Sequence, residues 1–489
     1  MGQHKKQAVV ILHGMGEQIP MQTLESFVDA VWTTDMELVC AGKPDPETGL
    51  QRKHNASWGK PDSRNHSYEL RRITTEASMY GGTTDFFEYY WADLMYGTTW
   101  EQVQAWLLDL LWRNPFRRVP RSVLAAWLVL WVIALCAIGV ALYGMVPADP
   151  GVRPNAFHAI LGGVGALALS AFVSNVLVAR FGDVARYVKA KPPNVARRQE
   201  IRSNGVELLE KLMYSTTTKG VPEYDRIIVV AHSLGTIIAY DILTQLFARH
   251  NTTLTAEMPQ PERDKMEQMI RRAGGLAVDC NTPPTSPQPL DIDAFQEQQA
   301  RCLAEAREHG SPWIISDFIT LGSPLTHAEF LLADSREDLR SRQASRVLPV
   351  CPPTLEHDGG TTLFHFSYGP DKDPAQHRLP HHAALFAYTR WTNIYSDHRM
   401  ILLGDLISGP LAKAFGLCPP GGSKDSVVSG IRDIAVLPVL DGTGTPVSGS
   451  RRRLLTHTHY WNLTKGDPGQ DGAPPPHIAA LRRALRLLR

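Results

Sequence analysis

Apolar residues in this chain follow two alternating patterns: short β-branched runs, and longer segments in which they recur every three or four positions. The short runs are typical of buried strands, and the recurring pattern is typical of amphipathic helices. Short runs occur at 8–12, 85–95, 227–231, 313–321, 388–397 and 429–440, with helical patterns at 21–32, at 195–214 and directly after Ser233. Strands alternating with helices predict an α/β fold, in which a mostly parallel sheet is flanked by helices.

Two further segments are apolar throughout and show no polar face. Val123–Val146 and Ala156–Ala179 carry no formal charge, and each exceeds the roughly 20 residues that span a bilayer core of about 30 Å as a helix. Because the turn-rich loop between them is short, we expect a transmembrane helical hairpin inserted into the α/β fold. The alternative is a pair of buried core helices, which would normally show a polar face.

Basic residues are concentrated outside this hairpin rather than in its loop. They are Arg113, Arg117, Arg118, Arg121, Arg180, Arg186, Lys189 and Lys191. The positive-inside rule then predicts a multi-pass membrane protein with two helices, with both termini and the α/β domain in the cytoplasm.

The hairpin would divide the α/β domain into two stretches of sequence. Residues 1–121 would form its N-terminal part, with an irregular insertion at 43–67 that is rich in Pro, Gly and Asn. Residues 122–180 would form the hairpin. Residues 181–489 would form the C-terminal part, with a lid-like or surface insertion at 251–310.

Composition argues against several classes of function. A net charge of +1 with 20% charged residues lacks the basic excess of a nucleic-acid-binding protein. The six cysteines are widely spaced and include no C-x-x-C pair, so we expect neither a disulfide framework nor a zinc site. No phosphate loop of the G-x-x-x-x-G-K type occurs. We therefore expect no cofactor and no metal ion.

The stretch IIVVAHSLGTIIAYDIL, residues 227–243, places a serine where a predicted strand meets a predicted helix. This fits a nucleophile elbow, which needs small residues two positions before and after the serine, here Ala231 and Gly235. Ser233 would present its hydroxyl at a sharp turn, and the backbone N–H of Leu234 would face a developing oxyanion. The alternative is that Ser233 only caps the helix.

A serine nucleophile needs a base and an acid that orients the base, in the chain order Ser, then Asp or Glu, then His. The sequence THTHYW follows the last predicted strand, so His457 or His459 would be the base. Two carboxylates follow the strand RWTNIYS, Asp397 directly and Asp405 a little later. A position at the strand end favours Asp397.

The loop after the first strand, HGMG at 13–16, would supply a second oxyanion donor. Glycines let the backbone approach a substrate carbonyl, so the N–H of Met15, or of Gly14, is expected to donate. His13 precedes the serine in the chain, and we expect it to hold this loop rather than act as a base.

Together these motifs resemble the α/β-hydrolase superfamily. The set VVILHGMGEQ, IIVVAHSLGT, DFITLGSPL, RWTNIYSD…GDLISGPL and HTHYW occurs in the expected order, and it is most similar to lipase-like and PGAP1-like serine esterases. The resemblance implies that the acid lies in a D-x-I-x-G-P stretch, at Asp405. It also implies that the base lies in an H-x-x-Y-W match, at His457, to complete a triad with Ser233.

We therefore expect a membrane-anchored serine hydrolase that cleaves carboxylic esters, of lipids or lipidated molecules, through an acyl-enzyme. Its partners would be the bilayer and a lipid or acyl-ester substrate. The same residues would serve an acyltransferase or a thioesterase. A membrane-tethered scaffold that keeps the fold without catalysis is the alternative from a different class.

Overall fold

The computed structural model describes most of the chain outside the central segment. The described residues are 5–95 with gaps at 16–18, 39–43, 45, 47, 51–53, 65–66 and 68; scattered positions between 112 and 139; and 187–487 with gaps at 189–191, 255–259, 278–285, 358–363, 369–378, 399–403, 420–425, 437–455 and 464–473. Most of the predicted hairpin therefore lies outside the described residues. Among the described residues, we find no helix with both the length and the apolar character needed to cross a bilayer.

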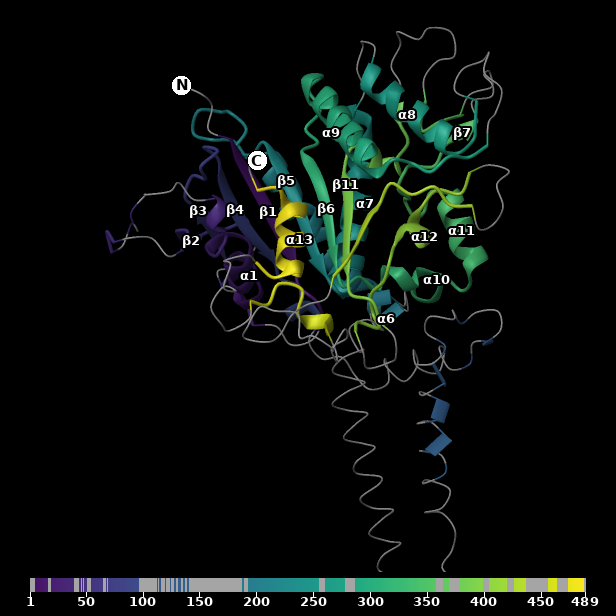
Figure 1. Cartoon of the computed structure of the whole chain (residues 1–489), viewed down its shortest axis with the longest axis horizontal. Coiled ribbons are helices and arrows are strands. Elements are labelled where there is room, and N and C mark those ends of the chain that lie inside the picture. The colour runs from purple at the N-terminus through teal and green to yellow at the C-terminus, as the bar shows by residue number, and fades with distance from the viewer. Residues whose placement is uncertain are drawn as a thin grey trace, which may run out of the picture.

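An eight-stranded sheet forms the centre of the molecule (Figure 1). Its spatial order is β12-β11-β6-β5-β1-β4-β3-β2. The strands from β12 to β4 are parallel, and β3 and β2 continue the sheet antiparallel. Their bounds are β1 Lys6–Leu12, β2 Ser57–Pro61, β3 Arg71–Thr75, β4 Thr83–Tyr89, β5 Arg226–His232, β6 Ile315–Leu321, β11 Arg390–Tyr395 and β12 Arg432–Ala435. The predicted α/β fold with a mostly parallel sheet is confirmed.

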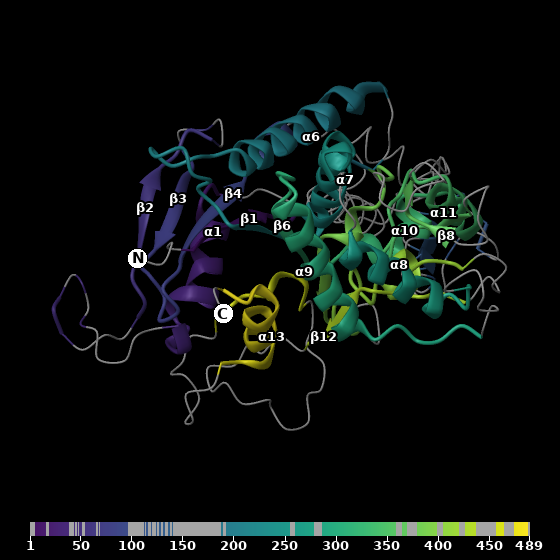
Figure 2. The same ribbon diagram turned by 90° about the horizontal axis from the view of Figure 1, so that it is seen from above.

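Helices cover both faces of this sheet (Figure 2). One face carries α1 Gln22–Val28 and α13 Pro476–Leu485, and the other carries α6 Pro192–Met213, α7 Leu234–His250, α8 Pro261–Ala273 and α9 Ile292–Glu308. Shorter elements surround these: α10 Ala328–Leu331, α11 Arg336–Ala344, α12 Ala412–Phe415, and the ribbons β7 Glu356–His357 with β8 Phe364–His365 and β9 Ser367–Tyr368 with β10 Leu379–Pro380.

The two covered faces explain why the central strand β5 is apolar at every inner position. Its side chains alternate between the faces: Ile227, Val229 and Ala231 join the core beneath α7, whereas Ile228 and Val230 join the core beneath α1 and α13. A strand buried on both faces needs a continuous apolar run rather than an alternating one.

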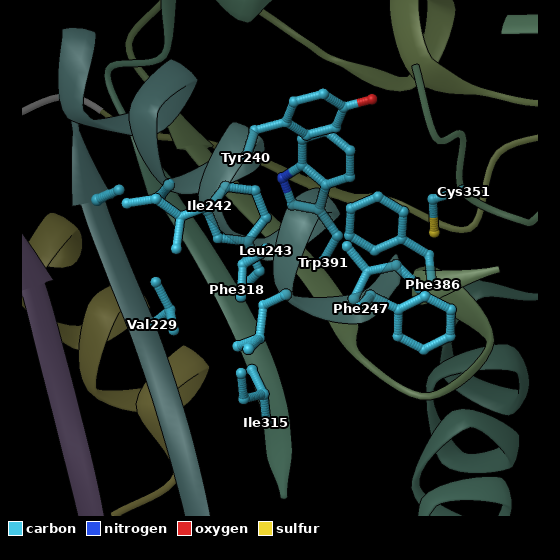
Figure 3. Close-up of a cluster of buried hydrophobic side chains, with 14 of the residues drawn as sticks. Val229, Tyr240, Ile242, Leu243, Phe247, Ile315, Phe318, Cys351, Phe386 and Trp391 are labelled. Carbon is cyan, nitrogen blue, oxygen red and sulfur yellow. The ribbon is translucent and has the colours of Figure 1, made fainter. Parts of the chain in front are cut away.

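Aromatic side chains fill the core between α7 and strands β6 and β11 (Figure 3). Trp391 stacks on Phe386 with ring centroids 4.6 Å apart, and Tyr240 of α7 lies 5.8 Å from Trp391 on another side. Phe247 lies about two turns after Tyr240 in α7. Its ring meets that of Trp313 edge-on, with centroids 5.1 Å apart. Such buried aromatic contacts fix α7, and therefore its first residues, against the sheet.

Two segments differ from the sequence predictions. Part of the predicted irregular insertion at 43–67 forms β2, which pairs with β3 and extends the sheet by two antiparallel strands. Part of the predicted surface insertion at 251–310 forms α9, whose residues Phe295, Gln299 and Cys302 are buried in the core. The glutamine escapes detection as a core residue because it is polar, and its buried side-chain nitrogen donates to the carbonyl groups of Phe386 and Thr389.

Candidate active site

Ser233 occupies the turn between β5 and α7, at the carboxyl end of the sheet. Its φ of 52° and ψ of −129° are sparsely populated by residues other than glycine, and such strain costs about 1–3 kcal/mol. Its N–H donates to the Leu321 carbonyl at 3.0 Å, and its own carbonyl accepts from the Thr236 N–H at 2.9 Å. The Ser233 hydroxyl makes no capping hydrogen bond to α7, so the helix-cap interpretation of this serine is wrong.

The hydroxyl of Ser233 instead meets His457, which lies on the short helix η8 (Thr456–Thr458). Nε2 of His457 lies 2.7 Å from Ser233 Oγ, and Nδ1 lies 2.9 Å from Asp405 Oδ2. Because a carboxylate can only accept, the imidazole proton is held on Nδ1 and Nε2 is left to accept the serine proton. Ser233, His457 and Asp405 therefore form a continuous hydrogen-bonded row.

Asp405 is buried, with its side chain fully removed from solvent. Burial opposes its ionisation, but His457, Tyr460 and Ser408 outweigh that effect and hold the pKa of this carboxyl well below its usual range. The Tyr460 hydroxyl donates to Oδ2 at 2.7 Å, and the Ile407 N–H donates to Oδ1 at 2.9 Å. A carboxylate held charged in this way stays an acceptor for the Nδ1 proton of His457.

The loop that carries His457 is attached to the serine turn through His232. Nε2 of His232 donates to the His457 carbonyl at 2.7 Å, and its ring meets Trp461 edge-on at 5.0 Å. Burial, reinforced by the neighbouring His457, lowers the pKa of His232 to about 3. The ring is therefore neutral at ordinary pH and serves as a fixed donor.

The loop after β1 lies directly beside the serine. Nδ1 of His13 donates to the Gly14 carbonyl at 2.8 Å, Nε2 accepts from the Trp91 N–H at 3.2 Å, and the ring stacks on Trp91 at 4.8 Å. Both ring nitrogens are thus used within the protein, as expected for a residue that holds the loop. A Cβ added to Gly14 would lie 3.0 Å from Ser233 Cβ, so only a glycine backbone approaches the serine this closely.

Gly235 allows the start of α7 to pack on the end of β1. A Cβ at this position would lie 2.4 Å from the His13 carbonyl oxygen and 2.8 Å from that of Leu12. The close approach sets the N-terminal N–H groups of α7, starting with Leu234, beside the loop that contains Gly14 and Met15. These are the backbone groups that the sequence nominates as oxyanion donors.

The two alternative site residues lie apart from the row. Asp397 is exposed, and it has no hydrogen bond to His457 in the part of the chain that the structure describes. His459 is half-buried, and its Nδ1 lies 2.9 Å from the Asn462 side-chain nitrogen. Of the four candidates, His457 contacts Ser233 and Asp405 contacts His457.

Sequence reasoning gave no role to Tyr460 and His232, although both lie inside the quoted motifs. Tyr460 follows His457 by one turn and contacts the carboxylate that the same histidine contacts. His232 immediately precedes the serine and holds the base-bearing loop. Their places in HTHYW and AHSLG could have indicated these roles, because polar aromatic residues next to a reacting group are often hydrogen-bonded to it.

The site offers one row of nucleophile, base and acid. Within the described ranges, no group of three or more His, Cys, Asp or Glu residues is placed to hold a metal ion. Comparisons of this chain with protein-family models, with curated proteins and with solved structures found no match.

Proposed function

We propose that this chain is a serine hydrolase that cleaves carboxylic esters. The observation that supports it most directly is the row in which Ser233 Oγ lies 2.7 Å from His457 Nε2 while Asp405 contacts Nδ1 at 2.9 Å. This geometry suits proton removal from the serine as it attacks a carbonyl carbon. The strained turn at Ser233 adds support, because backbone strain of this kind clusters at functional sites.

The proposed reaction has two halves. Ser233 Oγ attacks the ester carbonyl carbon, and its proton passes to His457 Nε2. The carbonyl oxygen becomes an oxyanion, which accepts hydrogen bonds from the N–H of Leu234 and from that of Met15 or Gly14. The intermediate then expels the alcohol, which takes the proton from His457, and leaves an acyl group on the serine.

In the second half, a water molecule gives a proton to His457 Nε2 and attacks the acyl carbon. The second tetrahedral intermediate releases the carboxylic acid and returns the proton to Ser233 Oγ. Asp405 keeps Nδ1 protonated throughout and stabilises the imidazolium that forms in each half. Its depressed pKa means that it stays ionised in this role.

We also propose that this α/β fold is the one shared by the α/β-hydrolase superfamily. It is supported by the serine turn that follows the central parallel strand β5. It is also supported by the chain order Ser233, Asp405, His457, which is the order found in that superfamily.

We further propose that the hairpin at 123–146 and 156–179 anchors the domain to a membrane, where a lipid or lipidated ester would be the substrate. The support is the uncharged length of both segments. The described positions of the first segment add to it: Leu128, Val132 and Leu135 each expose more than half of their surface, while Trp127 is buried in the core beneath α6 and α7. One side would thus hold the domain and the other would meet lipid.

A fluorophosphonate probe tests the hydrolase proposal on the full chain. We expect labelling of the wild-type protein and none of Ser233→Ala, with loss of turnover on long-chain and short-chain acyl esters. Ser323→Ala is a matched control, because Ser323 is also buried near the turn and bonds Thr236. Equal labelling of wild type and Ser233→Ala would rule the proposal out.

The membrane orientation has its own test. A cysteine placed in the loop at 147–155 should react with an impermeant maleimide added to intact cells. Reaction only after lysis would contradict a cytoplasmic domain, whatever the outcome of the labelling with fluorophosphonate.

A further inference from the structure

A pocket lies at the amino-terminal end of the sheet, far from the serine. Its volume is about 360 Å³, and its lining residues come from β6, β11, β12, α9 and α13: Gln296, Asp317, Thr392, Arg432, Ile434, Arg482, Arg483, Ala484 and Arg486. Asp317 pairs with Ile228 near the start of β5, whereas Ser233 follows the end of that strand. A strand rises about 3.3 Å per residue, so the pocket and the serine lie on the order of 15–20 Å apart.

Arginines dominate this site, which we call the arginine pocket. Four arginines line the pocket, and two more, Arg226 and Arg390, form ion pairs with Asp317 in its wall. The carboxylates that interact with these six arginines in the described structure are fewer: Asp317, Asp293, Asp35 and Glu37. Positive charge is therefore in excess around a concave space.

Some of the arginine donors have no acceptor among the described residues. Asp317 accepts from Arg390 at 2.8 Å, but the Nε of Arg390 is buried and lacks a hydrogen-bond partner among the described residues. The guanidinium groups of Arg483 and Arg486 form no hydrogen bond or ion pair with other described residues and are exposed at the pocket. A buried donor without an acceptor is costly.

The crowding of like charges is itself unfavourable. Partial burial lowers the pKa of the Arg486 guanidinium, and Arg390 and Arg432 lower it further, while Asp317 and Asp293 oppose the shift. Burial lowers the pKa of Arg226 as well; Asp317 opposes this shift, and Arg390 and Arg486 add to it. An anion in the pocket would reverse this repulsion and would also supply acceptors to the open guanidinium groups.

We propose that the arginine pocket binds a small molecule or headgroup that carries a phosphoryl group. A phosphoryl dianion offers three oxygens to planar guanidinium forks, a match that arginine makes better than lysine. The volume suits a compact organic phosphate, since small-molecule pockets start at about 300 Å³. The site is separate from Ser233, so it holds an effector or a structural ligand rather than the ester undergoing cleavage.

Calorimetric titration of the full-length Ser233→Ala protein with inorganic pyrophosphate tests the site. We expect saturable binding of one pyrophosphate per chain. Arg483→Gln/Arg486→Gln should weaken it by about tenfold or more, because the variant loses charge-assisted hydrogen bonds to the anion. Arg483→Gln alone, an exposed position on α13, provides a milder variant should the double change disturb folding.

Two exposed arginines far from the pocket give a matched control. Arg197→Gln/Arg249→Gln removes the same charge from α6 and α7 and should leave binding unchanged. Equal affinity in the pocket variant and the control would overturn the proposal. A second outcome would also overturn the proposal. If sodium chloride at the same ionic strength displaced bound pyrophosphate as effectively as added pyrophosphate does, the binding would be a nonspecific charge effect.

A further arm distinguishes the two sources of a phosphoryl group. Glycerol 3-phosphate and dihexanoyl phosphatidic acid carry the same phosphomonoester, but only the second carries acyl chains. Tighter binding of the lipid assigns the pocket to a lipid headgroup, and equal or weaker binding of the lipid assigns it to a free organic phosphate. Absence of binding by both, together with pyrophosphate, would overturn the proposal.

Discussion

The hydroxyl of Tyr460 lies 2.7 Å from Asp405 Oδ2, the same carboxylate oxygen that His457 Nδ1 contacts at 2.9 Å. The tyrosine oxygen also accepts the Ser396 N–H at 3.0 Å and lies 2.9 Å from Ser408 Oγ. One phenol therefore links the acid to the end of β11. It also competes with the histidine for the negative charge of the acid.

Tyr460→Phe should reveal that competition in a pH profile. Without the phenol, Oδ2 carries more negative charge toward His457 and attracts the proton of the base more strongly. The acid limb of kcat/KM should therefore move to higher pH, and stability should fall by about 1–3 kcal/mol because buried groups lose a partner. Urea unfolding and a pH–rate profile measure the two effects.

Tyr388→Phe is the control for this change. The Tyr388 hydroxyl is buried and lacks a hydrogen-bond partner among the described residues, so its removal should leave stability equal or higher. An acid limb that stays in place in Tyr460→Phe would show that the tyrosine acts only on packing.

Asp405→Asn should lower kcat by about 10⁴-fold while the protein stays folded, because an amide cannot hold the imidazole in the needed tautomer. Asp397→Asn, at an exposed position in the same connection, should retain the wild-type rate. Steady-state hydrolysis of an acyl ester measures both. Similar rates for the two variants would remove Asp405 from the proposed mechanism.

Gly235→Ala should disrupt the contact between α7 and β1. The new Cβ would meet backbone oxygen at 2.4 Å, and backbone cannot rotate away as a side chain can. We expect a loss of about 3 kcal/mol in unfolding free energy, together with loss of activity.

The matched change is Gly274→Ala, at the end of α8. There the nearest atom to a new Cβ lies at 3.4 Å, an ordinary contact, and φ is −79°. Its unfolding free energy should be unchanged or slightly higher. Equal stability of the two alanine variants would contradict the close approach at Gly235.

His13 should make the protein less stable below neutral pH. Burial lowers its pKa from 6.5 to about 4, so between these values the unfolded chain binds a proton that the folded chain does not. The contribution of neutral His13 to the unfolding free energy is therefore fully present above about pH 6.5, and it is lost as the pH falls toward 4. The contribution lost by about pH 5 is about 2 kcal/mol.

Unfolding in urea at about pH 7 and about pH 5 checks this. His13→Gln should show a decline that is smaller than that of wild type by about 2 kcal/mol. His382→Gln, at an exposed position, should decline like wild type. A His13 variant with the wild-type decline would show that this histidine is protonated in the folded protein.

The parallel core of the fold was predictable because its strands are buried on both faces. The side chains of Ile227–Val230 point alternately into the two cores, so each of these positions must be apolar. The resulting continuous apolar run is typical of a buried strand or helix. By contrast, β2 and β3 lie at one side of the sheet and lack a continuous apolar run, which Gly59, Lys60, Arg71 and Arg72 interrupt. Edge strands of this kind carry little periodic signal.

The sequence nominated the three residues that the structure joins in one row, and their catalytic roles stay predictions. Ser233 could be recognised because the strand, the small residues and the helix that define its turn are all adjacent to it in the sequence. The choice between Asp405 and Asp397 was not local. It depends on where Asp397 and Asp405 each lie relative to His457, which only the three-dimensional structure shows.

The separation of the row along the chain has a consequence for its biogenesis. Ser233 precedes His457 by 224 residues, so a ribosome adding about 5–20 residues per second would expose the serine roughly 10–45 s before its base. A nascent chain, or a product of premature termination before His457, would carry the serine without a proton acceptor. The reactivity proposed for Ser233 therefore starts only once translation has passed His457 and the loop that carries this histidine has folded.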